Sequence, residues 1–197
     1  MTMPRDMPDP ACDDALVARY AAGDPEAARA LVLRLVPRVM AYATRLLSDR
    51  AEAEDVAQEA MLRLWRAAPG WRPGEAKVST WVYRVVTNLA TDRLRARRRR
   101  GGPAPEDAPE PADDSPGVEA RLIAADRMDA LQAALAALPE RQREAVVLRH
   151  IEGLPNPEIA EILGVGVEAV ESLTARGKRA LAAALSGRRA ALGFEGE

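Results

Sequence analysis

Apolar side chains return every three or four positions through most of this 197-residue chain, the spacing that gathers them along one side of an α-helix. Prolines and glycines divide the pattern into segments. The segments predict eight helices, over residues 13–23, 25–49, 50–68, 80–100, 119–139, 140–153, 156–164 and 167–187. Only 4% of the residues are aromatic, while alanine, leucine, arginine and glutamate abound, which also favours helices. We therefore expect an all-α protein.

Several predicted helix ends carry capping residues. Asp24 followed by Pro25 is typical of a helix start, because an aspartate side chain accepts backbone hydrogen bonds of the first turn and proline fits the first helical position. On similar grounds we expect Ser79 to cap the helix over 80–100, and Asn156 to cap the helix that follows it. Pro37 lies inside the second segment, where it is expected to kink or divide the helix.

Residues 101–118 interrupt the helices with five prolines and three glycines among acidic residues. Such a segment has too little apolar surface to offset the entropy cost of ordering. We therefore expect a flexible acidic linker here, joining two small helical domains over 11–100 and 119–187. The terminal segments 1–10 and 188–197 are expected to be mobile tails.

Charge is distributed unevenly, although the formal net charge is only -2. Residues 1–100 carry 18 basic and 13 acidic side chains, residues 101–120 carry none and 6, and residues 121–197 carry 10 and 11. A basic block of this kind indicates a polyanionic partner. The acidic segment beside it would either screen the basic block or mimic that partner.

The composition also excludes several classes of protein. A single cysteine, Cys12, rules out an internal disulfide and a multi-cysteine zinc site. No apolar run has the length of a membrane span, and the N-terminal residues lack the apolar core of a signal peptide. We expect a cytoplasmic protein that does not insert into a membrane.

The sequence from Asn156 to Val170 has the pattern of a helix-turn-helix. It places small Ala160 where two helices approach, Gly164 where the turn needs a positive φ, and β-branched Val170 in the second helix. A purely structural helical hairpin is the alternative, but spacing, capping and turn together favour DNA reading. The second helix would then enter a major groove with Val167, Glu168, Glu171, Ser172, Ala175 and Arg176 outward, and with Lys178 and Arg179 placed for phosphates.

The helix over 80–100 ends in a cluster of arginines, which occupy six of the eight positions 93–100. At 100° per residue its inner stripe consists of Val82, Val85, Val86 and Leu89. The other side presents a polar face made of Arg84, Thr87, Asn88, Thr91, Arg95 and Arg98. A solvated surface is the ordinary explanation of such a face. Arginines without interspersed glutamates favour contact with nucleic acid instead.

A third polar face lies on the helix over 50–68, opposite its apolar stripe, and consists of Asp55, Gln58, Glu59 and Leu62. Asp55 and Glu59, together with nearby Glu52, supply three carboxylates and raise the question of a metal site. The only histidine of the chain, however, is His150. A polar face with an embedded leucine suits contact with another protein. A plain solvated face explains the pattern equally well.

Three stretches of the chain, in order and at similar spacing, resemble the extracytoplasmic-function group of bacterial sigma factors. They are AEDVAQEAMLRLWR, STWVYRVVTNLATDRLR and, after the acidic segment, LPERQREAVVLRHIEGLPNPEIAEILGVGVEAVESL. The resemblance implies a dissociable subunit that binds RNA polymerase core, recognises promoters and helps to open them. It also implies restraint by an anti-sigma factor.

The resemblance implies roles for the three polar faces. Asp55, Gln58, Glu59 and Leu62 would dock on the coiled coil of the largest core subunit, and the flap of the core would be a further contact. The helix from Trp81 to Arg98 and the loop over 70–78 would recognise and melt the -10 promoter element. The helix-turn-helix would read the -35 element. Its sequence is not transferable, because Glu171 and Leu173 stand where some members have arginines, and Gly166 stands where a serine cap is common.

Two rival interpretations remain. A free-standing helix-turn-helix repressor would bind duplex DNA tightly by itself, usually as a dimer, and the few cations of the second domain argue against that. An enzyme that acts on nucleic acid would need a phosphate-cradling glycine loop, clustered metal carboxylates or an activated nucleophile, and the sequence has none of these patterns. We therefore expect neither enzymatic activity nor a cofactor.

Overall fold

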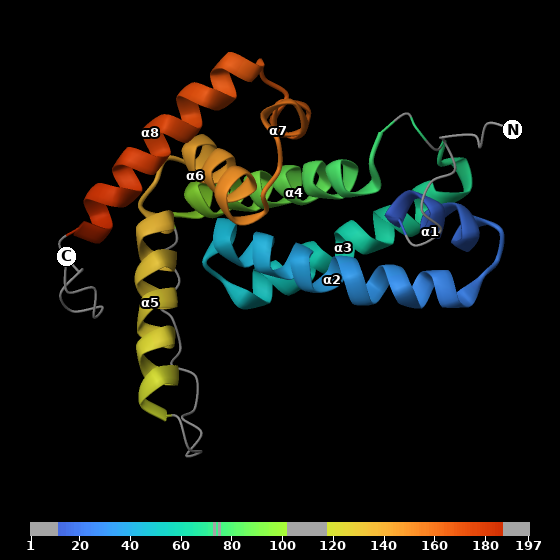
Figure 1. Ribbon diagram of the computed structural model, residues 1–197, viewed down its shortest axis with the longest axis horizontal. Helices are drawn as coiled ribbons and strands as arrows, with labels where there is room; N and C mark the ends of the chain where they lie inside the picture. Colours follow the sequence, from blue (N-terminus) through green and yellow to red (C-terminus); the bar gives the residue numbers. More distant parts are fainter. Residues whose placement is uncertain (1–11, 73, 75, 102–117, 187–197) are drawn as a thin grey trace, which may run out of the picture.

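The computed structural model describes residues 12–72, 74, 76–101 and 118–186. All regular structure in these residues is helical (Figure 1). The predicted tails and nearly all of the predicted linker lie outside the described residues.

The helices fall into two groups along the chain. The first group consists of α1 (Asp13–Ala21), α2 (Pro25–Leu47), α3 (Arg50–Ala67), the short 3-10 helix η1 (Ala68–Gly70) and α4 (Val78–Arg100). The second group consists of α5 (Val118–Ala136), α6 (Glu140–Val146), the π-helical stretch η2 (Val147–Ile151), α7 (Asn156–Leu163) and α8 (Val167–Ser186). The eight predicted α-helices and the all-α fold are confirmed.

Two helix starts differ from the expectation. Asp24 does cap α2, since its Oδ1 accepts from the N–H of Glu26 at 2.9 Å. The predicted Ser79 cap is wrong, because α4 begins two residues earlier than predicted, at Val78, and the N–H of Val78 donates to Oδ1 of Asp14, a residue of α1, at 2.9 Å. The Asn156 cap is also wrong, because α7 begins at Asn156 itself and Pro155 precedes it without a side-chain cap.

Pro37 lies inside α2 and does not divide it, because the helix runs without interruption from Pro25 to Leu47. The core of the first group lies between α2, α3 and α4, where Leu31, Tyr42 and Leu64 are fully buried. At its centre the hydroxyls of Tyr42 and Thr87 form a hydrogen bond of 2.8 Å. This bond ties α2 to α4 at mid-length.

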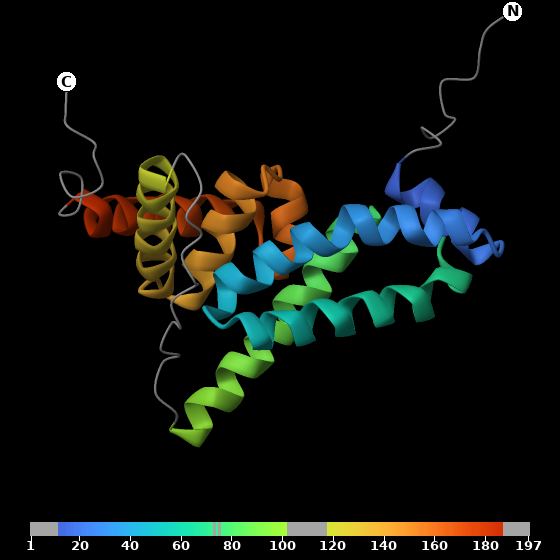
Figure 2. The same ribbon diagram turned by 90° about the horizontal axis from the view of Figure 1, so that it is seen from below.

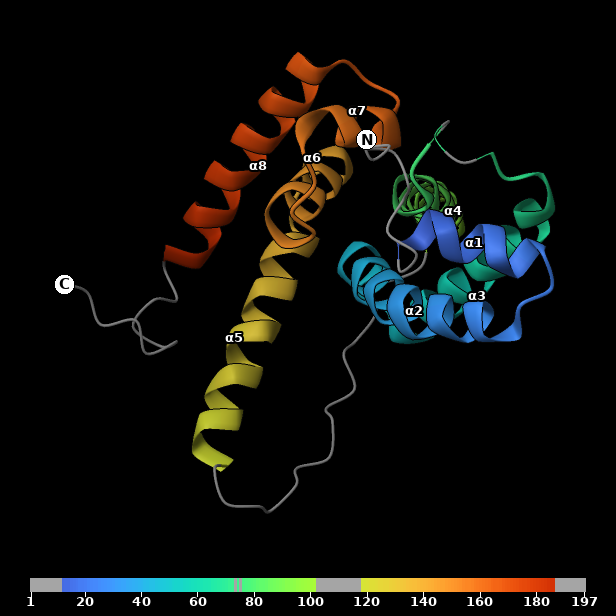
Figure 3. The same cartoon turned by 45° about the vertical axis from the view of Figure 1, so that its right-hand side comes forward.

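The two groups of helices pack against each other, and α4 is the element they share. The helices α2 and α3 lie along one side of α4, and α6 and α7 lie along another (Figures 1 and 3). The buried apolar residues of both groups form one continuous cluster. Helix α8 lies beyond α6 and α7, away from α4 (Figure 3). The last turns of α4 project past the other helices (Figure 2).

Candidate nucleic-acid and polymerase interfaces

The polar face predicted on α4 is real but narrower than the sequence indicated. Arg84, Asn88, Arg95 and Arg98 are exposed, and Thr91 is half-buried. Thr87 is only 2% exposed and points into the core, where it bonds to Tyr42 and donates to the carbonyl of Tyr83 at 2.8 Å. The prediction of Thr87 as a surface residue is therefore wrong.

The inner stripe of α4 is also rotated from its predicted position. Val82 and Val86 are buried as expected, whereas Val85 and Leu89 are only partly buried. The fully buried positions instead continue through Tyr83, Thr87, Ala90 and Leu94. The cause is tertiary: α4 packs on both sides, so the second helical group buries part of a face that periodicity assigns to solvent.

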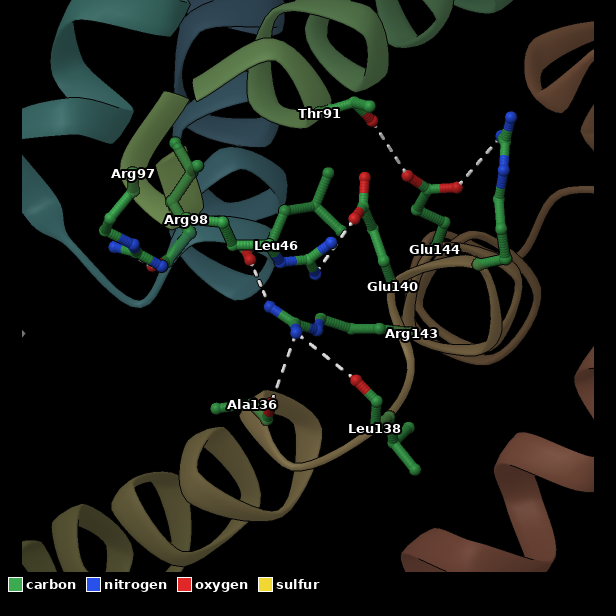
Figure 4. Close-up of polar contacts among 11 residues, drawn as sticks. Leu46, Thr91, Arg97, Arg98, Ala136, Leu138, Glu140, Arg143 and Glu144 are labelled. Atoms are coloured by element: carbon green, nitrogen blue, oxygen red, sulfur yellow. Dashed lines mark hydrogen bonds and ion pairs between the residues drawn. The ribbon is translucent and has the colours of Figure 1, made fainter. Parts of the chain in front are cut away.

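Glutamates and one carbonyl from the second group meet the polar side of α4. Glu158 forms an ion pair with Lys77 and accepts from Oγ1 of Thr80 at 3.2 Å. Glu152 accepts from the hydroxyl of Tyr83. The remaining contacts are Arg84 Nη2 to the carbonyl of Glu161 at 2.7 Å, Thr91 Oγ1 to Glu144 Oε1 at 3.2 Å, and Arg98 Nη2 to Glu140 Oε2 at 3.1 Å (the last two in Figure 4).

Burial changes the ionisation of this contact surface. The pKa of the Glu144 carboxyl is raised by burial, which the positive charge of Arg141 partly offsets. The pKa of the Tyr83 hydroxyl is raised well above its ordinary value, first by burial and then by its bond to Glu152. The ion pair with Glu158 raises the pKa of Lys77 and keeps it charged. The contact therefore pairs carboxyl groups of the second helical group with cationic and hydroxyl donors of the first.

The arginine cluster at the end of α4 has two functions within about two turns. Arg93 turns inward, donating to the carbonyl of Glu52 and lying 3.2 Å from its carboxylate. Arg97 donates to the carbonyl of Leu47 at 3.4 Å. Arg95, by contrast, is exposed on the projecting end of the helix together with Arg98, Arg99 and Arg100. Two of the six arginines, Arg93 and Arg97, hold the fold, and the other four are exposed on the helix end.

The loop before α4 encloses a small aromatic pocket of 240 Å³, lined by Ala67, Gly70, Trp71, Arg72, Ala76 and Trp81. The rings of Trp71 and Trp81 meet edge to face, with their centroids 5.9 Å apart. Nε1 of Trp71 is buried without a hydrogen-bond partner in the described structure. From the sequence Trp81 was named and the loop over 70–78 was assigned as a whole, so Trp71 was not identified individually. A tryptophan close before a proline and a glycine in the sequence was an available signal.

The four residues predicted on α3 lie together on the surface. Asp55, Gln58 and Leu62 are exposed, with Leu62 at 40%, and Glu59 is partly exposed. Glu59 binds Arg63 at 2.8 Å, and this bond holds the pKa of its carboxyl below the ordinary value. The four residues therefore form one surface, as the helical spacing predicted.

This surface borders an apolar groove of 460 Å³ between α2 and α3, lined by Val32, Val36, Met40, Glu54, Ala57, Gln58, Met61, Leu62 and Trp65. The α2 side of the groove was missed in the sequence. Val32 is 41% exposed and Leu33 is 67% exposed, so α2 is apolar on more than its core side. The run LVLRLV, over residues 31–36, is too rich in apolar residues for a single buried face and was the available signal.

The helix-turn-helix has the predicted geometry. Gly164 ends α7 with a φ of 64°, Ile159 and Val170 are buried, and the carbonyl of Gly166 accepts from the N–H of Val170 at 3.1 Å. The outward positions of α8 are open: Val167, Glu168, Glu171, Ala175, Arg176, Lys178 and Arg179 are exposed, and Ser172 is half-buried beneath Arg176.

Gly177 was not singled out from the sequence, yet it fixes how α8 crosses α6. A Cβ at this position would lie 2.5 Å from Cγ2 of Val146 and 3.1 Å from the carbonyl oxygen of Gln142. Only glycine permits this close approach of the two helices. The angle at which α8 presents its outer face therefore depends on Gly177.

The described residues contain no group of three or more side chains suited to hold a metal ion. None of their helices combines the length and hydropathy required to cross a bilayer.

Comparison with protein families assigns both groups of helices. The model of sigma-70 region 2 matches residues 31–100, and the model of sigma-70 region 4 matches residues 128–181. RNA polymerase sigma-H factor of Pseudomonas aeruginosa is 34% identical over 185 residues, which cover 88% of this chain and 93% of that protein. The chain belongs to the extracytoplasmic-function group of sigma-70 factors.

Other relatives agree with this membership. The sigma factor is 36% identical to ECF RNA polymerase sigma factor SigM of Mycobacterium tuberculosis, with 86% of this chain and 83% of that protein covered. Among solved structures it is similar to CnrH in complex with the cytosolic domain of CnrY, with a TM-score of 0.65, 28% identity and coverage of 89% of this chain and 97% of that one. As a sigma factor, the chain directs promoter-specific initiation of transcription by RNA polymerase.

The family matches divide the sigma factor along its two helical groups. Region 2 spans α2, α3 and α4, and so includes the groove and the polar side of α4. Region 4 spans the end of α5 through most of α8, and so includes the helix-turn-helix. In this sigma factor the contacts between Glu158 and Lys77, and between Glu140 and Arg98, join region 4 to region 2.

Proposed function

We propose that this sigma factor divides promoter recognition among three surfaces. The end of α4 and the loop before it bind and melt the -10 element, α8 reads the -35 element, and the α3 surface with its groove docks on core polymerase. The observation that carries the proposal is the presence of two separate cation-bearing helical faces on one chain, beside an acidic and apolar surface suited to a protein. A repressor would not need the third surface.

Two features of region 2 support its role at the -10 element. Arg95 and Arg98 are exposed on a helix end that projects from the molecule, where phosphates can approach (Figure 2). The pocket beside Trp71 and Trp81 has the apolar aromatic walls on which an unstacked base can rest. An opened strand gains both contacts and a closed duplex gains only the first, so binding here would favour melting.

The exposed side of α8 supports reading of duplex DNA at the -35 element. Glu168 and Glu171 can accept from cytosine amino groups in a major groove, and Arg176, Lys178 and Arg179 can contact phosphates. With so few cations, region 4 adds specificity rather than much affinity. Attachment to core polymerase would supply the remaining affinity by raising the local concentration of α8 at the promoter.

The groove between α2 and α3 supports docking on a helical element of core polymerase. Its apolar floor can take an apolar ridge, and Asp55 and Glu54 at its border can meet basic residues beside that ridge. By the family resemblance this element is the coiled coil of the largest subunit. We further propose that the sigma factor is restrained by an anti-sigma factor, as the complex of the similar protein CnrH with CnrY suggests.

In vitro transcription tests the proposal. Purified core polymerase transcribes a genomic DNA library with and without the sigma factor, and we expect discrete new start sites only when it is present. Transcription by the sigma factor alone, or tight dimeric binding to duplex DNA without core, would contradict the proposal.

Two double variants separate the surfaces in this assay. Arg95→Ala with Arg98→Ala should lower initiation about 100-fold while sparing core binding, because two charged hydrogen bonds to DNA are lost. Glu59→Arg with Leu62→Asp should instead weaken co-purification with core polymerase. Arg29→Ala with Arg127→Ala removes the same charge at exposed sites elsewhere and should initiate normally.

A further inference from the structure

A row of carboxylates from region 4 covers the polar side of α4. Four glutamates, Glu140, Glu144, Glu152 and Glu158, bind side chains of the region that leads from Lys77 to Arg98. Glu140 and Glu144 lie on α6, Glu152 follows η2, and Glu158 lies on α7. Their partners come in the reverse order along the chain, from Arg98 back to Lys77. Region 4 therefore runs antiparallel to α4 and offers it an anionic group about once per two helical turns.

Two charged residues at the centre of this contact, Arg143 and Glu144, are buried and hydrogen-bonded to region 2. Arg143 is 7% exposed and donates to the carbonyl of Leu46 on α2, while its Nη2 donates to the carbonyls of Ala136 at 3.2 Å and Leu138 at 3.3 Å (Figure 4). Glu144 is 1% exposed between Thr91 and Arg141. Such groups are costly to bury unless the opposing surface satisfies them.

A second anchor lies on α5. Nε2 of Gln132 donates to Oγ of Ser48 at 2.8 Å and to the carbonyl of Thr44 at 3.1 Å. Together with Arg143 it binds backbone carbonyls in the last turn of α2, of which that of Thr44 also accepts from the N–H of Ser48 at 2.8 Å. Region 4 is thus fixed at one end by α2 and along its length by α4.

The carboxylates occupy the positions that DNA phosphates would need. A carboxylate and a phosphate both offer anionic oxygens to the same ammonium, guanidinium and hydroxyl donors. Arg98 illustrates the competition, because its Nη2 lies 3.1 Å from Glu140 and the same group is assigned to promoter DNA. Arg84 is likewise engaged by the carbonyl of Glu161 at 2.7 Å. Region 4 and DNA would therefore compete for these donors.

We propose that region 4 of this sigma factor is an internal competitor of promoter DNA, whose glutamates mimic phosphates and keep the -10 surface of α4 closed in the free protein. The inference rests on the proposed assignment of α4 to the -10 element. The closed protein is poor at binding single-stranded DNA until region 4 is drawn away, as docking on core polymerase would do. The outer side of α8 stays open in the closed state, so closure masks melting and leaves duplex reading available.

The test uses the full chain and neutralises two glutamates that lie outside the surfaces assigned to DNA. Glu140→Gln with Glu158→Gln removes the anions opposite Arg98 and Lys77 and alters no residue of α4. Asp126→Asn with Asp129→Asn is the matched control, because it makes the same change of charge on exposed positions of α5. Circular dichroism verifies that both variants remain helical.

Two measurements are made on wild type and both variants without polymerase. Small-angle X-ray scattering reports the radius of gyration, and fluorescence anisotropy reports affinity for a fluorescein-labelled single-stranded oligonucleotide. We expect the interface variant to expand and to bind the strand about tenfold more tightly than the control, because the apparent affinity scales with the open fraction. Wild type and control should scatter alike.

Each other outcome overturns a defined part of the inference. Equal affinity of the interface variant and the control would show that any gain comes from net charge alone. Unchanged scattering of the interface variant would show that the glutamates do not hold the closed state, while initiation with core polymerase would still test the proposed function. Expansion without a gain in affinity would overturn the competition itself, together with the assignment of α4 to DNA.

Discussion

Helices α4 and α8 both present cation-bearing faces assigned to promoter DNA, yet the two faces stand in opposite situations. On α4, Lys77, Arg84 and Arg98 are bound by groups from region 4. On α8, Arg176, Lys178 and Arg179 are exposed on the outer side of the molecule. Similar sequence patterns thus produce one occupied face and one open face. Which face is available depends on what the rest of the chain packs against it.

The contrast also separates two kinds of recognition. The face of α8 reads a duplex, which is present wherever a promoter lies and requires no change in the DNA. The face of α4, with the pocket beside Trp71, is suited to a strand that must first be unpaired. Covering α4 while leaving α8 open would let the free protein avoid single strands without losing the surface that finds a promoter.

Substitution of Arg143 should have the largest effect on the packing of region 4 that covers α4. Arg143→Ala removes the buried guanidinium that joins α6 to α2 and leaves its carbonyl acceptors unpaired. We expect the free energy of unfolding to fall by about 3 kcal/mol, measured by urea denaturation. Arg29→Ala, at an exposed position of α2, should change it by less than about 0.5 kcal/mol. An equal, small effect of both substitutions would contradict the role of Arg143.

A smaller effect should follow from a change on the open face. Arg176→Ala with Lys178→Ala removes two exposed cations of α8 and should weaken promoter binding by the holoenzyme about tenfold, with a salt dependence reduced by roughly two units of slope. Because these side chains lie outside the contact with α4, the scattering of the free protein should not change. Expansion of the free variant would show that the two faces are not independent.

The smallest effect should come from Glu144, through pH. Burial raises the pKa of this carboxyl in the folded protein, so its contribution to stability is fully present below the ordinary glutamate pKa and is lost as pH rises through the raised value. Glu144→Gln has no such loss, while its amide oxygen can still accept from Thr91. The variant should therefore gain stability relative to wild type as pH rises above about 4, the ordinary glutamate pKa. A difference that is constant with pH, in paired urea titrations, would contradict this assignment.

The helices and the turn at Gly164 were predictable because local signals determine them. Apolar spacing of three and four residues identifies the helices, Asp24 identifies the start of α2, and a positive φ favours glycine between α7 and α8. The surface of Asp55, Gln58, Glu59 and Leu62 was predictable for the same reason, since these residues are neighbours on one helix.

Apart from the Asn156 cap, the errors share one origin, which is contact between residues distant in the chain. Val78 is capped by Asp14, 64 residues away, so the local cap expected at Ser79 is not used. Thr87 bonds to Tyr42, 45 residues away, and therefore points inward. The α2 side of the groove was missed because it becomes a surface only where α2 lies beside α3.

By itself the sequence determined the eight helices, the helix-turn-helix and the side of each helix on which charges collect, because these depend on the order of residues within a few turns. Only the tertiary structure decided that Glu140, Glu144, Glu152 and Glu158 meet α4, and that Arg93 and Arg97 of the arginine cluster hold the fold. The physical reason is that periodicity fixes which side chains share a face, whereas complementary charge, buried hydrogen bonds and shape select which two faces meet.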